Sequence, residues 1–228
     1  FNAFGSNPPI IAFSPARRGR DNTTKDTYEN IRTTEEVVIN VVNHKIVEQS
    51  VLASTEYPES HDEFDKAGFT KVPAETVKPY RVAESPVHLE CRLLDLINYA
   101  EVNGAANIAI CEVQLMHIAE DAYSDSEYPD PRKLDLIGRM GQNWYDRAAD
   151  GLFEINAPPG NDNIGFDQMP KAVLESPILT GNELAKLARF QRLPEAATVA
   201  QVKQEPQIAG LYQTHQDEPE HLEVALHE

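Results

Sequence analysis

The sequence predicts a mainly β protein with flanking helices, in which an antiparallel sheet closes, or nearly closes, into a barrel. Two long segments, 85–99 and 106–120, alternate apolar and polar residues, which is typical of half-exposed strands. Shorter apolar segments recur without the regular spacing of βαβ units, and this favours antiparallel over parallel pairing. After about residue 156 the composition changes, so residues 157–228 are predicted to be an extension rather than a second barrel domain.

The first elements follow from short apolar runs and a capping pattern. Residues 8–14, PPIIAFS, are an apolar run that begins with prolines, and they predict a strand. Residues 26–35 predict a short helix, with Asp26 as its N-cap and Glu29 three residues further on, as in a capping box. The near-continuous valines and isoleucines of residues 35–43 predict a strand buried on both faces.

The middle of the chain is predicted to hold two helices, at 44–55 and 60–67, followed by the two long strands. In the strand 85–99, one face is expected to carry Val87, Leu89, Cys91 and Leu93, and the exposed face His88, Glu90 and Arg92. In the strand 106–120, one face is expected to carry Ala109, Cys111, Val113, Leu115 and His117.

Composition excludes several classes of function. The formal net charge of −17 argues against nucleic acid or membrane partners, because such binding relies on clustered Lys and Arg. No run approaches the roughly 20 apolar residues of a membrane span. Cys91 and Cys111 lie in apolar segments and are expected to be buried and reduced, as in cytoplasm. No zinc-binding cysteine pair, HExxH motif or Walker-type phosphate loop is present, so no metal site is expected.

A small basic segment interrupts this acidic chain. Within residues 1–25, four cationic side chains face the single carboxylate Asp21, which makes a net charge of +3 and leaves −20 for the rest. The cationic residues are Arg17, Arg18, Arg20 and Lys25. Such a segment suits one small anion, which the surrounding field would otherwise repel. The alternative is a solvated loop whose arginines pair with surface carboxylates.

The extension, 157–228, begins with a segment rich in Pro, Gly and Asn. Two short helices are predicted in GNELAKLARFQ (181–191) and PEAATVAQVKQ (194–204), and an acidic tail in DEPEHLEVALHE (217–228). Because these stretches bury little apolar surface alone, we expect them to pack on the barrel domain, 1–156, of the partner subunit.

Six motifs occur in an order that resembles the flavin reductase-like proteins with an FMN-binding split barrel. They are FNAFGSNPPIIAFSP, KDTYENI, EEVVINVV, VKPYRVAESPVHLECRL, EVQLMHI and IGRMGQNWYDRA. The resemblance covers residues 1 to about 150 and, less strongly, the extension, which is similar to that of longer bacterial members. It implies an antiparallel split β-barrel, FMN as cofactor, and transfer of a hydride from NADH or NADPH to the flavin.

Members of this family normally carry one or two further strands before the position of Phe1, including a segment that helps to bind FMN. We therefore expect the native chain to extend upstream of Phe1; the alternative is a truncated member whose barrel and flavin site are incomplete. The additional strand is expected to pair with the strand that contains Ile10 and Ile11, since a lost barrel strand would leave an unpaired edge.

The resemblance also implies where the flavin ring lies. Backbone amides beside small side chains in FNAFGS can approach the edge of a flat ring closely. The residues concerned are Asn2, Ala3, Phe4, Gly5 and Ser6. The alternative is a plain strand that ends in a turn before Pro8.

For the phosphate of FMN, the resemblance favours Lys25 and Thr27 at the start of the helix, where unpaired N–H groups and the helix dipole attract anions. Arg17 is a further candidate for this phosphate. The alternative is that Asp26 caps the helix and Lys25 is an ordinary surface residue.

Three other residues are candidates for contacts with the flavin or the nicotinamide. The resemblance places a histidine at the position of His117, where it would orient the nicotinamide or donate a proton. Gly141 and Tyr145 would contact the ring or the second substrate. The alternatives are a hydrogen-bonded core histidine and, for Trp144 and Tyr145, core aromatics beneath the extension.

The resemblance implies a homodimer with FMN at its interface, and a monooxygenase or another protein that accepts the electrons. No acid–base pair or nucleophile is required, because hydride transfer is the chemistry of the two cofactors. Two other functions remain open. One is a non-catalytic FMN-binding protein, and the other is a dimeric structural protein that no longer binds flavin.

Overall fold

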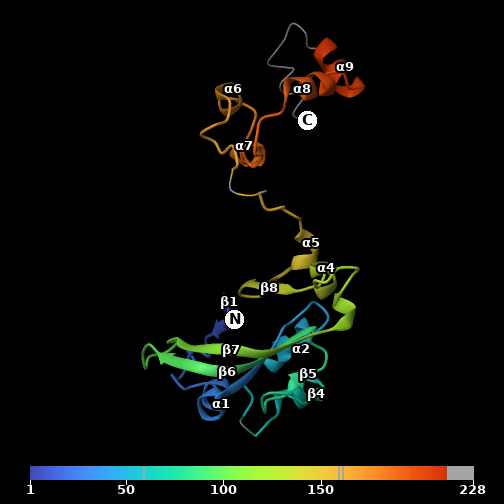
Figure 1. The fold of residues 1–228 in the computed structure, drawn as a ribbon. Helices are drawn as coiled ribbons and strands as arrows, with labels where there is room; N and C mark the ends of the chain where they lie inside the picture. Colours follow the sequence, from blue (N-terminus) through green and yellow to red (C-terminus); the bar gives the residue numbers. More distant parts are fainter. Residues whose placement is uncertain (59, 159, 161, 215–228) are drawn as a thin grey trace. The chain divides into compact units, whose positions relative to one another are not determined.

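The computed structural model describes residues 1–58, 60–158, 160 and 162–214 of the chain (Figure 1). The chain divides into two compact units, Phe1–Phe153 and Glu154–Glu228. The boundary predicted from composition, between residues 156 and 157, stays a prediction.

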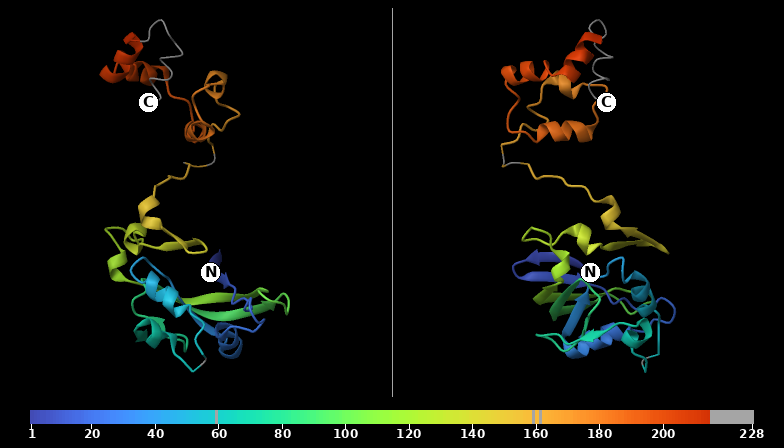
Figure 2. Two further views of the ribbon diagram at one scale, coloured as in Figure 1. Left: turned by 180° about the vertical axis from the view of Figure 1, so that it is seen from behind. Right: turned by 90° about the vertical axis from the view of Figure 1, so that its right-hand side faces the viewer.

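The first unit is built on a sheet of five antiparallel strands in the order β1-β2-β7-β6-β3 (Figures 1 and 2). The strands are β1 (Asn2–Ser6), β2 (Pro9–Phe13), β3 (Glu36–Asn40), β6 (Val87–Asn98) and β7 (Asn107–Ile118). This confirms the prediction of a mainly β, antiparallel protein. Among the described residues, β1 and β3 are not paired with each other, so the sheet is not closed.

Shorter elements complete this unit. The helices are α1 (Asp26–Thr34), α2 (Val47–Ala53), α3 (Glu63–Ala67), the 3-10 turn η1 (Glu120–Ala122), α4 (Pro131–Leu134) and α5 (Ala148–Gly151). The short strands are β4 (Lys71–Val72), β5 (Arg81–Val82), β8 (Ile137–Gly141) and β9 (Trp144–Arg147). The helices predicted at 26–35, 44–55 and 60–67 are therefore confirmed.

Strand β2 has no free edge, because β1 pairs with one side of it and β7 with the other. The expected pairing of an upstream strand with Ile10 and Ile11 is therefore wrong. The FNAFGS segment forms the first strand of a tight hairpin, in which Ser6 lies opposite Pro9. This agrees with a strand that ends in a turn before Pro8.

Strand β3 is not buried on both faces, and that prediction is wrong. It pairs only with β6 and forms an edge of the sheet, so all five of its residues are partly exposed. Val37 and Ile39 pack against the core, whereas Glu36 and Asn40 project from the opposite face and bind backbone N–H groups of Lys78 and Val82.

Helix α1 begins differently from its prediction. Its N-cap is Lys25, no side chain caps the helix, and Asp26 is the first helical residue. The Asp26 carboxylate instead lies 3.6 Å from the guanidinium of Arg18. Glu29 accepts hydrogen bonds from the Thr24 hydroxyl and from Arg32 rather than from the N-cap. The capping box is therefore absent, because an ion pair and a neighbouring hydroxyl engage its two carboxylates.

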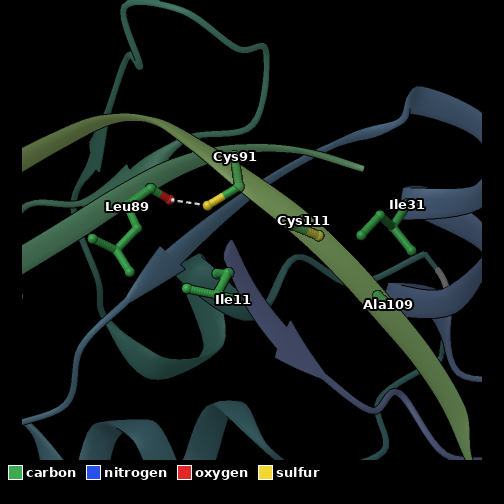
Figure 3. Close-up of a cluster of buried hydrophobic side chains, with 6 residues drawn as sticks. All are labelled: Ile11, Ile31, Leu89, Cys91, Ala109 and Cys111. Carbon is green, nitrogen blue, oxygen red and sulfur yellow. Dashed lines mark hydrogen bonds between the residues drawn. The ribbon is translucent and has the colours of Figure 1, made fainter. Parts of the chain in front are cut away.

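The apolar core lies between α1 and one face of the sheet. Figure 3 shows its six buried side chains, Ile11, Ile31, Leu89, Cys91, Ala109 and Cys111. Ile31 from α1 is 1% exposed, and burial of a side chain of this size contributes about 1.5–3 kcal/mol. Both cysteines are free and buried, as expected.

A β-bulge changes which side chains share the other face of the β6–β7 pair. Cys91 lies opposite Val113 but Glu90 lies opposite Leu115, so Gln114 has no partner in β6. Beyond the bulge, side chains of β7 project from the opposite face, and His117 lies across from His88. The prediction that His117 shares a face with Ala109 and Cys111 is therefore wrong.

The alternating pattern of residues 85–99 also places Glu90 on the wrong kind of surface, because its side chain is fully buried. Segment 73–85 covers it and donates several hydrogen bonds to it. The prediction that Glu90 is exposed is wrong, since periodicity does not reveal what covers the outer face of a strand.

The second unit contains the short helices α6 (Lys171–Leu174), α7 (Gly181–Ala188), α8 (Ala196–Val202) and α9 (Pro206–Thr214). The predicted helices in 181–191 and 194–204 correspond to α7 and α8. Thr180 and Glu183 form a capping box at the start of α7. Met169, Leu184 and Ala188 form a small apolar cluster within this unit. The acidic tail predicted at 217–228 lies outside the described residues.

Among residues 1–58, 60–158, 160 and 162–214, no helix has the length and apolarity that crossing a membrane requires.

Candidate functional site

The loop between β2 and α1 holds the arginines of the basic segment, and two of them are already paired with carboxylates. Arg18 lies 3.6 Å from both Asp26 and Glu56. Arg20 lies 3.2 Å from Asp21 and 3.3 Å from Glu56. For these two residues the structure agrees with a loop whose arginines pair with surface carboxylates.

Arg17 stabilises the same loop from inside. Its guanidinium donates to the backbone oxygen of Asn22 at 2.6 and 3.0 Å and to the Asn22 side chain at 2.7 Å. Its backbone N–H donates to the carbonyl of Ala105 at 3.0 Å. Arg17 therefore connects the loop to the β6–β7 turn, and its Nε and Nη2 groups are engaged by Asn22.

Lys25 differs from these arginines. Its side chain is exposed at the first turn of α1 and, within the part of the chain that the structure describes, its ammonium group forms no ion pair. The carbonyl of Lys25 accepts from Tyr28 and Glu29, but no side chain caps the helix. Thr27 is exposed in the same turn. The start of α1 thus presents an unpaired cation beside an uncapped helix end.

Strand β1 places Asn2, Ala3, Phe4, Gly5 and Ser6 on the surface of the unit. The Asn2 side-chain oxygen accepts from the N–H of Ala3 at 2.9 Å, and Phe4 is 68% exposed. A Cβ at Gly5 would lie 3.2 Å from the carbonyl oxygen of Pro8. The hairpin itself therefore favours glycine at this position.

His117 belongs to a buried polar cluster on the outer face of β6 and β7. Its Nε2 lies 2.7 Å from Oε1 of Glu90, and its Nδ1 lies 3.9 Å from Glu75. The other donors to Glu90 are the backbone N–H groups of Glu75 and Thr76 and the Thr76 hydroxyl, at 2.6–3.1 Å. Every neighbour hydrogen-bonded to this carboxylate is therefore a donor.

Hydrogen bonding decides the charge of Glu90. Burial alone raises the pKa of this carboxyl, but the hydrogen bonds from Thr76, Glu75 and His117 outweigh burial and lower the pKa to about 2. Burial lowers the pKa of the neighbouring His88, whose Nε2–H donates to the Val82 carbonyl at 2.7 Å. The cluster thus holds an ionised carboxylate at neutral pH.

The hairpin β8–β9 and α2 border a polar groove of about 750 Å³. Its lining includes His44, Glu48, Arg139, Tyr145, Asp146 and Arg147. Gly141 is the last residue of β8, just before the hairpin turn, and its φ of 101° is a conformation that favours glycine. Trp144 is 74% exposed and Tyr145 is 40% exposed, so neither is in the core of the first unit.

The candidate residues fall into separate groups. Lys25 and Thr27 share one helical turn, and His117 lies in the Glu90 cluster. Tyr145 lines the groove beside the β8–β9 hairpin. In Figure 1, β8 lies on the opposite side of β6 and β7 from α1. Strand β1 is aligned through β2 with residues 109–112 of β7, away from His117. Among the described residues of the first unit, the start of α1, strand β1, His117 and Tyr145 are therefore not in contact with one another.

Sequence reasoning missed Glu90, Thr76 and the groove residue Arg139. Glu90 was the one with a usable signal, because a carboxylate between Leu89 and Cys91 interrupts an apolar stretch that otherwise continues to Leu93. Such a group needs internal donors if it is buried.

The family model of the flavin reductase like domain matches residues 1–133. An uncharacterized protein of Deinococcus radiodurans is 34% identical over 158 residues, which cover 68% of this chain and 67% of that protein. A protein of Halalkalibacterium halodurans is 31% identical over 165 residues, which cover 72% of this chain and 78% of that protein.

Solved structures share the fold. Component B of nitrilotriacetate monooxygenase from Bacillus cereus superposes with a TM-score of 0.62 at 25% identity, covering 68% of this chain and 75% of that one. Flavoredoxin of Desulfovibrio vulgaris has a TM-score of 0.57 at 25% identity, covering 68% and 78%. A flavin reductase with a split barrel domain from Shewanella frigidimarina has a TM-score of 0.58 at 23% identity, covering 70% and 75%. The chain therefore belongs to the flavin reductase-like domain family and has its split-barrel fold.

Proposed function

We propose that this chain binds FMN and reduces it with NADH or NADPH. The observation that carries the proposal is Lys25, an exposed cation without an ion-pair partner among the described residues, at an uncapped helix start within the family-matched domain. An unpaired lysine beside free helix N–H groups is a favourable place for a phosphate dianion.

The surroundings of Lys25 fit this ligand. A carboxylate at the start of α1 would compete with phosphate for the helix N–H groups, but Asp26 lies beside Arg18 instead. Arg18 and Arg20 are each paired with two of the carboxylates Asp21, Asp26 and Glu56. Lys25 forms no ion pair among the described residues and so stays available to an incoming anion.

In this proposal each group of residues has one task. Lys25 and the hydroxyl and N–H of Thr27 hold the phosphate, while Arg17 keeps the loop in place through Asn22. Backbone amides of β1 hold the ring edge. Among the described residues, His117, Gly141 and Tyr145 do not meet β1 and Lys25 within one chain, so in this proposal the FMN lies at the homodimer interface, where they contact the ring or the nicotinamide. A bound flavin supplies the chemistry, since its N5 accepts a hydride from the nicotinamide C4.

Two protein partners belong to the proposal. The first is a second copy of the chain, with residues 157–228 packed on it. Deleting this segment is expected to weaken the dimer, and an unchanged mass in sedimentation would contradict that role. The second is a monooxygenase that takes the reduced flavin, as the similarity to component B of nitrilotriacetate monooxygenase suggests.

A second function is a flavin-carrying electron-transfer protein without reductase activity, which the similarity to flavoredoxin favours. A structural dimer without flavin is the third possibility that the sequence leaves open. The visible spectrum of the purified protein mixed with FMN separates the third from the other two, because bound oxidised flavin is yellow. Steady-state oxidation of NADH with added FMN then separates a reductase from a carrier.

The phosphate site is tested by Lys25→Ala. Charge-assisted hydrogen bonds to phosphate are worth on the order of 1.5–3 kcal/mol, so FMN affinity is expected to fall roughly ten- to a hundredfold. Riboflavin lacks the phosphate and should bind as before. Thr27→Val should act in the same direction but more weakly, and added salt should reproduce part of the Lys25→Ala effect.

Lys78→Ala is the matched control, since Lys78 is also an exposed lysine of the first unit but lies on another segment. If FMN and riboflavin lost affinity equally, or if neither changed, Lys25 would not bind the phosphate.

A further inference from the structure

Hydrogen bonds within the protein fix the orientation of the Glu90 carboxylate in the absence of any ligand. Oε2 accepts from the Thr76 N–H at 2.6 Å and the Thr76 hydroxyl at 2.7 Å, and Oε1 accepts from the Glu75 N–H at 2.9 Å. These donors belong to segment 73–85, which covers the outer face of β6. The side chain is fully buried, so no solvent competes for its oxygens.

The second donor to Oε1 is Nε2 of His117, at 2.7 Å. An ionised carboxylate carries no proton, so in this contact the imidazole must donate. The pKa of Glu90, lowered to about 2 by its hydrogen bonds against the effect of burial, keeps the carboxylate ionised across the range in which an imidazole titrates. The proton on a neutral His117 is therefore held at Nε2.

The other nitrogen of His117 faces away from Glu90. Nδ1 lies 3.9 Å from the Glu75 carboxylate, which is too long for a hydrogen bond, and the Glu75 side chain is 65% exposed. The remaining titratable neighbours are His88, whose ring centroid is 6.1 Å away, and Arg81, which lies 3.9 Å from Glu90. Neither donates a hydrogen bond to His117.

We propose that Glu90 is a positioning residue, which holds His117 in the Nε2–H tautomer and in one orientation, so that Nδ1 is the nitrogen presented to a ligand. That the ligand is the nicotinamide or the flavin rests on the proposed function. The tautomer does not rest on it, because it follows from the donors around Glu90. The bulge at Gln114 makes this contact possible by moving His117 to the face of Glu90.

Glu90→Gln gives a sharp test because an amide has one acceptor and one donor. Its oxygen is expected to stay at the Oε2 position, where Thr76 supplies two donors, which directs the NH2 group at Nε2 of His117. Nε2 must then accept, so the proton moves to Nδ1. Thr76→Val is the matched control, since it removes one donor to Oε2 and leaves the Oε1 contact intact.

The measurement is a long-range ¹H–¹⁵N correlation spectrum of the imidazole rings in the full-length protein as purified, above the pH range in which imidazoles titrate. His117→Asn assigns the signals. The wild type and Thr76→Val are expected to carry the proton on Nε2, and Glu90→Gln on Nδ1. A proton on Nδ1, or one shared between both nitrogens, in the wild type overturns the proposal, and this result does not require Glu90→Gln to fold. An unchanged tautomer in folded Glu90→Gln overturns it as well.

A second readout separates positioning from simple anchoring of segment 73–85. With FMN bound, Glu90→Gln should slow flavin reduction by NADH roughly 10- to 100-fold at unchanged FMN affinity, whereas Thr76→Val should not. Equal losses in both variants would mean that Glu90 only anchors the segment, and would overturn the positioning role. If the wild type bound no flavin, the proposed function would fail while the tautomer result would still decide the role of Glu90.

Discussion

Glu90 and Cys91 are adjacent in β6 and both are fully buried, but they face opposite surroundings. Cys91 packs with Ile11, Leu89 and Cys111 in the apolar core beneath α1 (Figure 3). Glu90 lies on the other face, under segment 73–85, where every hydrogen-bonded neighbour is a donor. The two faces of β6 are thus both buried at this point, one stabilised by apolar packing and the other by hydrogen bonds to an ionised carboxylate.

The two faces should respond differently to change. An apolar core tolerates replacement by a side chain of similar volume, because dispersion contacts are many and individually weak. A buried charge that satisfies several donors has no such tolerance, since removing it leaves all of them unpaired. The polar face should therefore be the more sensitive to single substitutions.

The largest effect is expected for Glu90→Leu. It removes the acceptor of the Glu75, Thr76 and His117 donors at the fully buried position of Glu90, and should lower the free energy of unfolding by about 3–5 kcal/mol. Urea denaturation measures the change. A loss no greater than that of Cys91→Ala would show that the two faces are equally sensitive to substitution.

The two faces of β6 should also lose their contributions to stability at opposite ends of the pH scale. The pKa of Glu90 is lowered from 4.5 to about 2, so its contribution to stability is present above pH 4.5 and is lost as the pH falls towards 2. Burial raises the pKa of Cys91 from 9.0 to about 12 and that of Cys111 to about 11. Their contribution is present below pH 9.0 and is lost as the pH rises through these values.

Thermal melts across pH check this prediction, with Glu90→Leu as the control for the acid side and a Cys91→Ala, Cys111→Ala double variant for the alkaline side. In a plot of melting temperature against pH, Glu90→Leu should reduce only the fall at acid pH, and the double cysteine variant only the fall at alkaline pH. An acid limb that is unchanged in Glu90→Leu would assign acid sensitivity to other carboxylates.

The smallest effect is expected for Cys111→Ala. It removes one sulfur atom from the apolar face and leaves no polar group unpaired, so a cost of roughly 1–2 kcal/mol is expected. Urea denaturation again gives the value. A cost above that of Glu90→Leu would reverse the order of the two faces.

Much of the fold could be predicted from local sequence signals. The apolar alternation of 85–99 and 106–120 marks β6 and β7, and local propensity marks α1, α2 and α3. These signals act within a few residues, which is why they can be read from one sequence. The edge position of β3 could not be predicted, because its run of Val and Ile does not say how many strands flank it.

The candidate site was less predictable, for physical reasons. The bulge at Gln114 inserts one residue into β7 and moves His117 to the other face, and no residue type marks such an insertion. Glu56 pairs with two arginines that lie far from it in the sequence, so charge counting could not show that Arg18 and Arg20 are paired while Lys25 forms no ion pair among the described residues. Both the face on which His117 lies and the pairing of Arg18 and Arg20 depend on contacts between segments that are distant in the sequence.

We propose that this chain binds FMN and passes electrons to it from a reduced nicotinamide. Anaerobic mixing of the protein and FMN with NADH or NADPH tests this most directly, by following the loss of flavin absorbance against free FMN under the same conditions. Bleaching is expected to be much faster with the protein than without it, and slower again in Lys25→Ala at subsaturating FMN. Bleaching at the rate of free FMN with both nucleotides would contradict the proposed function.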